Sequence, residues 1–231
     1  MQHRLILSFL LNLVAINFAY AQVKTTETKN DTIVKDTISK VKNPNHLYVG
    51  VDFSTPIQQI FSNKQGVQAF VSYQIKPKLV AIVEGGYEKN KYDEASWDVD
   101  VDGVFGKIGV NWFFTQESNH AANGFYAGIR LAYSSYNQTI NSYVIRDIYT
   151  NQIIGEGSKD KAQVSSYWAE LVVGGRVGLI KNLYADFSIH TAVFLGGKKQ
   201  EGIDPLVIPS YGRNNGPFNI PIFWGISYQL F

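Results

Sequence analysis

Hydrophobic and polar residues alternate along most of the chain from Leu47 onwards. Alternation with a period of two places successive side chains on opposite faces of a β-strand. Each run is about ten residues long and is bounded by turn residues, a pattern typical of outer-membrane barrels. The pattern predicts eight strands, over Leu47–Phe53, Gly66–Lys76, Leu79–Tyr87, Val104–Phe114, Gly124–Tyr136, Val164–Ile180, Leu183–Phe194 and Ile220–Phe231.

The connections between these runs alternate between short and long. The short ones are Lys76–Lys78, Thr115–Asn123 and Lys181–Asn182. Outer-membrane barrels combine short periplasmic turns with long extracellular loops, and the same alternation is expected here. The long connections are Glu88–Gly103, Asn137–Gln163 and Leu195–Asn219.

Alternation alone does not say which face points inward, so a soluble barrel with an apolar core is the alternative interpretation. The polar faces carry Gly, Ala and Ser with one or two charges per strand. Small side chains suit the narrow lumen of an eight-stranded barrel better than a solvated surface. Aromatic residues also gather toward the strand ends, where membrane interfaces place them. Both features favour a membrane barrel with its apolar face toward lipid.

The N-terminal segment Met1–Ala21 has the features of an export signal. Arg4 lies in its basic start, Leu5–Ile16 is apolar, and Ala19–Ala21 forms an A-x-A site that predicts cleavage before Gln22. A single transmembrane helix is the alternative, but two asparagines interrupt the segment and about 20 apolar residues are needed to span a bilayer.

Composition limits the possible domain organisation and the possible classes of function. Residues 22–45 are rich in Thr, Lys and Asp without an aromatic residue, which predicts a flexible periplasmic arm before one barrel domain over 46–231. The net charge of +2 is too weak to indicate nucleic-acid binding, and the absence of cysteine excludes disulfides and thiolate metal sites. The charged share of 17% is low against the roughly 25% of soluble domains.

Together the export signal, the eight alternating runs, the loop asymmetry and the final WGISYQLF resemble the small eight-stranded outer-membrane barrels of Gram-negative bacteria, the OmpA- and OmpX-like, porin-like class. The resemblance covers about Leu47–Phe231. It implies an all-β, eight-stranded antiparallel transmembrane barrel, monomeric in the outer membrane, in contact with lipid and lipopolysaccharide and folded by the barrel-assembly machinery.

That resemblance also assigns a role to the last strand. Its expected assembly residues are Trp224, Tyr228, Leu230 and Phe231. In this class an aromatic residue stands two positions before a terminal Phe and on the same face. Here Tyr228 shares its face with Leu230, and Phe231 falls on the other face. Because of this departure, the resemblance does not say which side chain at the C-terminus contacts the assembly machinery.

Seven ionisable residues fall on the polar, predicted lumen face. Buried charges must be paired, so we expect a charge network that fills and stiffens the barrel. A proton- or ion-conducting path through the same residues is the alternative, because ionisable groups inside a membrane are candidates for transport. The residues of this expected network are Glu84, Lys107, Arg130, Glu170, Arg176, Asp186 and His190.

Other site chemistry is weakly supported. Ser188 and His190 lie on one strand face, as a Ser/His pair would, but they point into a charged lumen and no GxSxG or HExxH motif occurs. We therefore expect no catalytic residue and no cofactor. Asp98–Gly103 matches the first six positions of a calcium loop, yet position twelve is Gly109 and not Glu. An acidic strand edge with a bulge near Gly103 is the preferred interpretation, and a calcium site is the alternative.

The long loops are the remaining candidates for function. Asn137–Gln163 contains its own alternation and a Thr150–Asn151 turn, which predicts a hairpin that extends the fifth and sixth strands. Apolar residues there and in Leu195–Asn219 predict a surface patch that binds a protein partner or lipopolysaccharide: Tyr143, Ile145, Ile148, Tyr149, Leu206, Ile208 and Tyr211. The sequence thus indicates a structural or surface-interaction role, with a small channel or transport accessory as the alternative and a lipid-modifying enzyme third.

Overall fold

The computed structural model describes residues 46–59, 63–94, 96–114 and 123–231. The predicted export signal and periplasmic arm, residues 1–45, lie outside the described residues, as does nearly all of the predicted turn Thr115–Asn123. Within the described part of the chain, no helix has the length and apolar character needed to cross a membrane.

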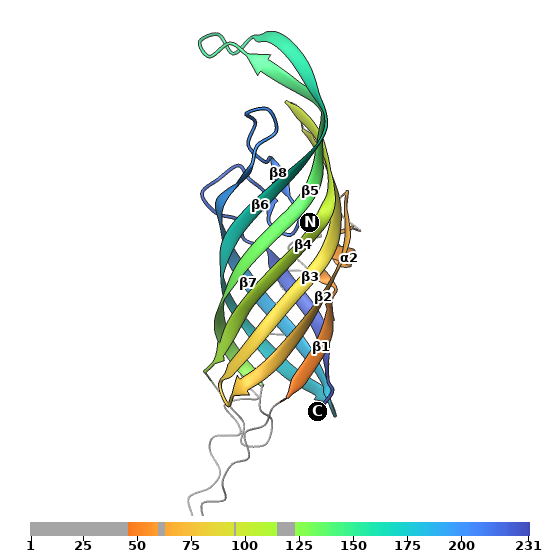
Figure 1. Ribbon diagram of the computed structural model, residues 1–231, viewed down its shortest axis with the longest axis vertical. Coiled ribbons are helices and arrows are strands. Elements are labelled where there is room, and N and C mark those ends of the chain that lie inside the picture. Colours follow the sequence, from red (N-terminus) through yellow and green to blue (C-terminus); the bar gives the residue numbers. More distant parts are fainter. Residues whose placement is uncertain (1–45, 60–62, 95, 115–122) are drawn as a thin grey trace, which may run out of the picture. The chain divides into compact units, whose positions relative to one another are not determined.

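Residues 46–231 form a closed antiparallel barrel of eight strands, in the ring order β1-β10-β7-β6-β5-β4-β3-β2 (Figure 1). The ring closes where β1 pairs with β10, from Tyr48 opposite Gln229 to Asp52 opposite Gly225. The predicted all-β, eight-stranded antiparallel barrel is confirmed. The strands are β1 (Leu47–Asp52), β2 (Lys64–Lys76), β3 (Leu79–Glu94), β4 (Trp97–Phe113), β5 (Gly124–Arg146), β6 (Ile153–Ile180), β7 (Leu183–Lys198) and β10 (Ile222–Gln229).

The two faces of each strand differ in the way that the alternation predicts. On β2, Ser72 and Gln74 point into the barrel and are buried, while Val71, Tyr73 and Ile75 point outward and are exposed. The outer surface of the barrel wall is apolar all round the ring, while the lower interior holds polar side chains together with buried apolar ones such as Phe70, Val80 and Ile82. This arrangement is the reverse of a soluble barrel with an apolar core.

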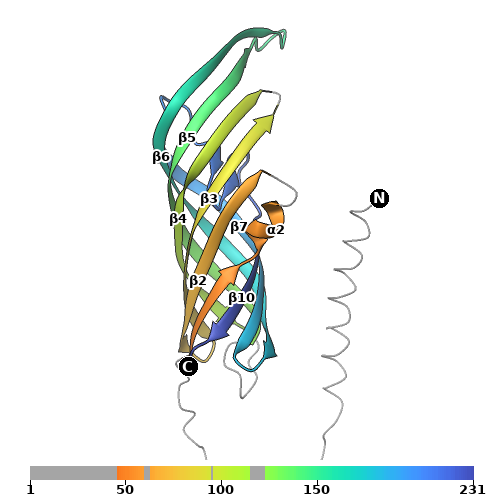
Figure 2. The ribbon, with the colours of Figure 1, turned by 90° about the vertical axis from the view of Figure 1, so that its right-hand side faces the viewer.

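The strands differ greatly in length. β5 and β6 have 23 and 28 residues, whereas β1 and β10 have six and eight. The wall is therefore tall on the side of β3 to β6, and the β5–β6 hairpin projects furthest (Figures 1 and 2). The predicted connection Glu88–Gly103 is not a loop, because β3 runs on to Glu94 and β4 already begins at Trp97. The predicted hairpin within Asn137–Gln163 is present, with Arg146 opposite Ile153.

In the outer half of the barrel, apolar side chains point inward and polar side chains point outward. On β4, Val99 and Val101 point inward and are fully buried, while Asp98, Asp100 and Asp102 alternate with them on the outer face. The pairing of β3 with β4 continues without interruption past this region, so the bulge expected near Gly103 is wrong. The lower interior thus combines the polar side chains with two buried apolar clusters, one of them around Tyr48, Tyr126 and Tyr184, while the outer interior is lined mainly by apolar side chains.

Three short elements lie at the low side and in the mouth of the barrel. α2 (Ser54–Gln59) follows β1 and packs against β2 and β10 (Figure 2). Asp52 fixes its start by accepting hydrogen bonds from the Ser54 backbone N–H at 2.7 Å and the Ser54 hydroxyl at 2.6 Å. β8 (Val207–Ile208) and β9 (Gly212–Arg213) form a two-stranded hairpin inside the loop that joins β7 to β10.

Candidate functional site

The barrel interior contains all seven residues that the alternation places in the lumen. Each is at most 5% exposed. Three acidic and three basic side chains form three ion pairs, and a histidine joins one of them. These residues, called the network below, are Glu84, Lys107, Arg130, Glu170, Arg176, Asp186 and His190.

The first pair joins β3 to β5. Arg130 Nε donates to Glu84 Oε1 at 2.8 Å, and Gln68 Nε2 on β2 donates to the other carboxylate oxygen at 3.0 Å. Arg130 Nη1 also donates to the backbone carbonyls of Val110 and Ile129. The guanidinium therefore has partners on three strands, which fixes its direction across the lumen.

The second pair is centred on Glu170 of β6. Its Oε1 accepts from Lys107 Nζ on β4 at 2.9 Å and from Trp168 Nε1 at 2.7 Å. Its Oε2 lies 2.6 Å from His190 Nδ1 on β7, and His190 Nε2 lies 2.8 Å from Ser188 Oγ. One buried carboxylate thus holds three neighbouring groups, as a desolvated anion requires.

The third pair joins neighbouring positions on β6 and β7. Arg176 Nε donates to Asp186 Oδ1 at 2.6 Å, and Ser227 on β10 donates to Asp186 Oδ2 at 2.7 Å. Arg176 Nη2 reaches Ser72 on β2 at 3.2 Å, and its guanidinium carbon lies 4.5 Å from the ring centre of Tyr48 on β1. This group links the strands on both sides of the β1–β10 closure.

The chain of Ser188, His190 and Glu170 has the connectivity of a serine hydrolase triad. Two observations count against catalysis. The Glu170 charge is already compensated by Lys107, and Ser188 is only 2% exposed and, unlike His190, does not line the cavity of about 260 Å³ at the barrel mouth. We interpret the chain as part of the network that holds β6 to β7.

Above the network, residues 199–219 fold back into the barrel mouth and are called the plug below. Val207, Ile208 and Tyr211 are fully buried, and the Tyr211 ring packs edge-on against Trp168 with centroids 5.8 Å apart. The apolar inner face of the outer half needs an apolar cover, and the plug supplies it. The predicted exposed patch is therefore wrong for Ile208 and Tyr211, and Leu206 is partly buried against the same cluster.

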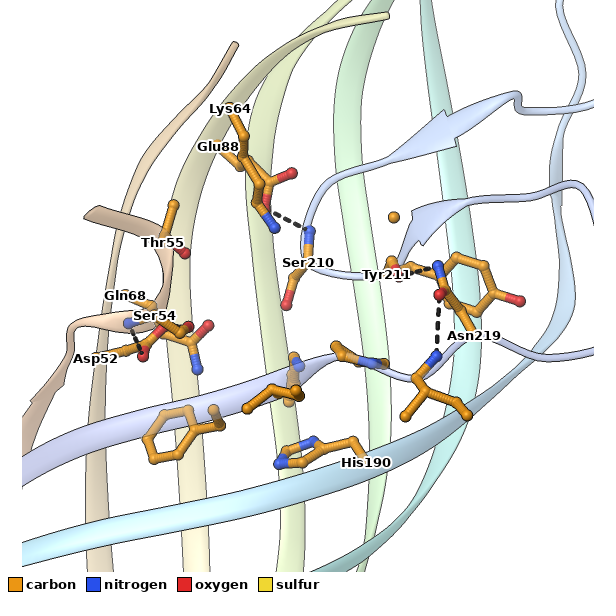
Figure 3. Close-up of a pocket in the computed structure, with 16 residues that line it drawn as sticks. Asp52, Ser54, Thr55, Lys64, Gln68, Glu88, His190, Ser210, Tyr211 and Asn219 are labelled. Carbon is orange, nitrogen blue, oxygen red and sulfur yellow. Dashed lines mark hydrogen bonds and ion pairs between the residues drawn. The ribbon is translucent and has the colours of Figure 1, made fainter. Parts of the chain in front are cut away.

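Hydrogen bonds fix the plug to the barrel wall. The Ser210 backbone N–H donates to Glu88 Oε2 at 3.0 Å (Figure 3), and the Leu206 N–H donates to Gln138 Oε1 at 3.2 Å. Gln138 Nε2 donates in turn to Gln200 Oε1 at 3.0 Å. These bonds hold the start, the middle and the central turn of the plug, so it behaves as part of the core rather than as a free loop.

The projecting β5–β6 hairpin carries the other predicted interaction residues. Tyr143 stacks on Trp97 of β4 with ring centroids 5.4 Å apart, and it is only half-buried. Ile145 is exposed, and Ile148 and Tyr149 at the tip are 86% and 89% exposed. Ile148 and Tyr149 at the tip form no patch with the plug residues, which point inward, whereas Tyr143 packs against the same apolar cluster as the plug.

The acidic run of β4 is a strand face. Asn141 Nδ2 bridges Asp98 Oδ1 and Asp100 Oδ2 at 3.1 and 2.8 Å, while Asp102 accepts from Asn137 and Lys161. Across the described residues, no group of three His, Cys, Asp or Glu side chains is arranged to hold a metal ion. β4 is paired with β3 and with β5 along this run, so the aspartates lie on a strand face and the predicted strand edge is wrong.

The predicted assembly residues lie at the end of β10. Trp224, Tyr228, Leu230 and Phe231 all have exposed side chains. Trp224 packs edge-on against Phe187 of β7. The backbone beyond β10 continues to pair with β1, since the Leu230 N–H donates to the Leu47 carbonyl and the Leu47 N–H to the Phe231 carbonyl. The last strand thus presents Trp224 and Tyr228 on the outer surface of the closure, with Leu230 in the same phase and Phe231 beyond the end of β10.

Sequence reasoning missed several residues that line or close the mouth. Glu88 and Gln138 fell inside predicted loops, yet both are fully buried contacts of the plug. Trp168 was assigned to a strand without a role, although its indole binds Glu170 and packs on Tyr211. The alternation over Trp97–Asp102 is a signal that could have extended β4, whereas Glu88–Glu94 of β3 is almost wholly polar and carries no such signal.

Comparison with known proteins places the chain in a family. Residues 3–230 match the family model described as "Domain of unknown function (DUF6048)". The chain belongs to this family. No curated protein matches it.

Two solved structures are similar to this member of the DUF6048 family. One is the N-terminal β-barrel domain of Pseudomonas aeruginosa OprF, at 11% identity and a TM-score of 0.38, with 82% of this chain and 100% of that chain covered. The other is a major outer membrane protein from Thermus thermophilus, at 12% identity and a TM-score of 0.44, with 80% of this chain and 98% of that chain covered.

Proposed function

We propose that this protein is a sealed, non-enzymatic outer-membrane barrel that acts through interactions at the cell surface. The outward side chains of the wall support the membrane placement, since Val67, Ile108, Phe125 and Leu171 are each at least 60% exposed. A bilayer would cover this apolar surface, which would be costly in water. The short turn between β2 and β3 would then face the periplasm and the long hairpin the exterior.

The side chains that cross the lumen are the observation that supports the proposal. Three ion pairs cross the lower interior, and the plug packs on apolar residues above them. An eight-stranded barrel is only wide enough for its side chains to fill. Function is therefore assigned to the surface rather than to transport through the barrel.

A planar-bilayer recording tests the seal. We expect the refolded protein to insert without producing stepwise currents, because charged pairs and the plug occupy the water path. A wide porin inserted in the same bilayer serves as the control for detection. Reproducible single-channel steps from the wild-type protein would instead favour the small-channel alternative.

The hairpin tip is the best candidate for the contact surface. Asp147 Oδ1 accepts hydrogen bonds from the backbone N–H groups of Thr150 and Tyr149, and these bonds hold the pKa of Asp147 below its usual range. The resulting rigid turn presents Ile148 and Tyr149 to the exterior. Rigid, exposed aromatic and aliphatic residues are the usual anchors of protein contacts.

Replacing the tip side chains should abolish capture of a surface partner. We expect Ile148→Ser with Tyr149→Ser to reduce crosslinking from a photoreactive group at Gln152 by about tenfold or more, since anchor residues contribute about 2 kcal/mol or more each. Ser158→Asn, a polar change on the same hairpin, is the matched control. Equal crosslinking by both variants would mean that the hairpin is not the contact surface. The arm formed by residues 22–45 would then be the better candidate.

A further inference from the structure

The distal part of the β5–β6 hairpin is a ribbon of two strands with no third strand beside it. Going outward, the pairing of β4 with β5 ends at Tyr143, and the pairing of β7 with β6 ends at Ser165. Beyond these positions β5 and β6 pair only with each other, out to Arg146 opposite Ile153 (Figures 1 and 2). Ile153 and Ile154 are 54% and 65% exposed, so the ribbon has no core of its own. A ribbon of this kind is marginally stable in water, and a third strand usually stabilises it.

One edge of this ribbon leaves backbone hydrogen-bonding groups for another strand. Along Ile153–Lys159 of β6, called the free edge below, the backbone groups that point away from β5 have no strand partner among the described residues. The free edge ends at Asp160, whose carbonyl accepts from Gln200 Nε2 of the plug at 2.6 Å. The register with β5 shifts on either side of Glu156, so the regular part of the free edge is short and centred on that residue.

The inner face of the free edge is formed by glycines that side chains of β5 cover. Gly155 and Gly157 stand opposite Ile145 and Tyr143. A Cβ atom at Gly157 would overlap the Tyr143 ring, and one at Gly155 would contact the Ile145 side chain, so both side chains reach across β6 toward its edge. Aromatic side chains cover edge glycines in this way. The apolar surface of β5 is therefore within reach of the side chains of an added strand.

The outer face of the free edge is polar and carries an unpaired charge. Glu156 and Ser158 are exposed there. Across the part of the chain that the structure describes, no basic side chain forms an ion pair with Glu156, whereas Lys159 pairs with Glu201 of the plug. Opposite charges that face each other across two strands stabilise their pairing. An added strand with a basic side chain beside Glu156 is therefore favoured.

A row of backbone donors and acceptors selects a peptide, because a lipid or a sugar does not repeat both groups at the spacing of a strand. We propose that the free edge binds an extended segment of a partner protein, which adds to β6 as a third strand. Its apolar side chains would lie on the inner face, against Tyr143 and Ile145, and a basic side chain would lie beside Glu156. This inference rests on the surface role proposed above and names the kind of partner and the mode of contact.

Titration with a synthetic peptide tests the strand addition. The probe alternates valine with lysine over about seven residues, a usual length for a strand. The full-length mature protein is held in a zwitterionic detergent, and binding is measured by fluorescence anisotropy of the labelled peptide and by hydrogen exchange of the β6 amides. We expect the peptide to slow exchange at alternate residues of Ile153–Lys159, because alternate amides point toward an added antiparallel strand. Absence of peptide binding would overturn the proposal.

N-methylation of the peptide separates strand addition from apolar adhesion. In one peptide the valine amides are methylated, and in the other the lysine amides, so each peptide loses the donors of one edge. We expect one of them to bind like the unmodified peptide and the other to bind about tenfold more weakly, since only one edge pairs with β6. Equal affinities of the two methylated peptides would show that backbone pairing is not the mode of contact.

Two variants of the protein test the side chains that select the partner. Ile145→Ser removes apolar surface from the inner face and should weaken binding about threefold or more. Glu156→Lys should weaken binding of the valine–lysine peptide about fivefold and favour a valine–glutamate peptide instead. Asp93→Lys makes the same charge change at an exposed position of β3 and is the matched control. Heat-modifiable migration confirms that each variant is folded, and equal affinities of Glu156→Lys and Asp93→Lys would contradict the proposed selection by charge.

The tip residues distinguish a failure of this inference from a failure of the surface role. If Ile148→Ser with Tyr149→Ser loses crosslinking while the wild-type protein does not bind the peptide, the hairpin contacts its partner through tip side chains alone. Strand addition is then overturned and the surface role stands. Peptide binding that depends on one peptide edge and on Glu156 supports strand addition.

Discussion

Glu170→Ala is expected to lower the free energy of unfolding of the barrel by about 3–5 kcal/mol. The change removes the carboxylate that Lys107, His190 and Trp168 contact, while the Lys107 ammonium stays buried. An uncompensated buried charge costs more than the pair itself contributes to stability. Urea unfolding in lipid vesicles, followed by Trp fluorescence and by heat-modifiable migration, measures the loss.

Two controls identify the cause of that loss. Glu156→Ala removes an exposed carboxylate from the same strand and should change stability by no more than about 0.5 kcal/mol. Lys107→Met combined with Glu170→Leu leaves neither charge of the pair in the interior and should recover most of the stability. If Glu170→Ala unfolds like the wild type, the network is hydrated and the channel alternative gains support.

The lower half of the barrel could be predicted from the sequence because one physical rule governs it. Apolar side chains face outward, and the inward positions carry small or paired polar side chains together with several aromatic ones, so a period of two marks most of the strands. β7 begins at the predicted Leu183, and β2 ends at the predicted Lys76. The same rule assigned all seven network residues to the inner face, although it could not say which acid meets which base. Pairing such as that of Lys107 with Glu170 depends on the register of distant strands.

The outer half of the barrel could not be predicted, because there the apolar side chains face inward and the polar ones face outward. Val99 and Val101 point inward beneath the plug, while the aspartates between them point outward. When the apolar side chains of one strand move from the outer to the inner face, the alternation of apolar and polar residues is interrupted. The sequence pattern then predicts a loop where the strand continues. β3 and β4 were cut short for this reason.

The plug and α2 could not be predicted from local pattern. β8 and β9 contain two residues each, which is too short for a detectable period. Whether Ile208 and Tyr211 face solvent or the interior depends on the apolar surface that β4 to β7 present at the mouth. That surface is formed only after the barrel closes, so exposure was the natural but wrong expectation.

Tyr211→Ala is expected to release the plug from the barrel mouth. Truncating a buried aromatic side chain costs about 3–5 kcal/mol, and Tyr211 is 1% exposed between Trp168 and Phe194. This energy stabilises the closed plug, so its loss raises the population of the open form by about 100-fold or more. Trypsin cleavage after Arg213 reports that population when opening is faster than cleavage.

The comparison that decides the role of Tyr211 uses a second tyrosine. Tyr149→Ala removes the same side chain from the exposed hairpin tip and should leave cleavage after Arg213 unchanged, because Tyr149 has no place in the plug. The barrel below should stay folded in both variants, since the network ion pairs are untouched. Equal cleavage rates for Tyr211→Ala and Tyr149→Ala would mean that the hydrogen bonds which the plug donates to Glu88 and Gln138 hold it without the aromatic contact.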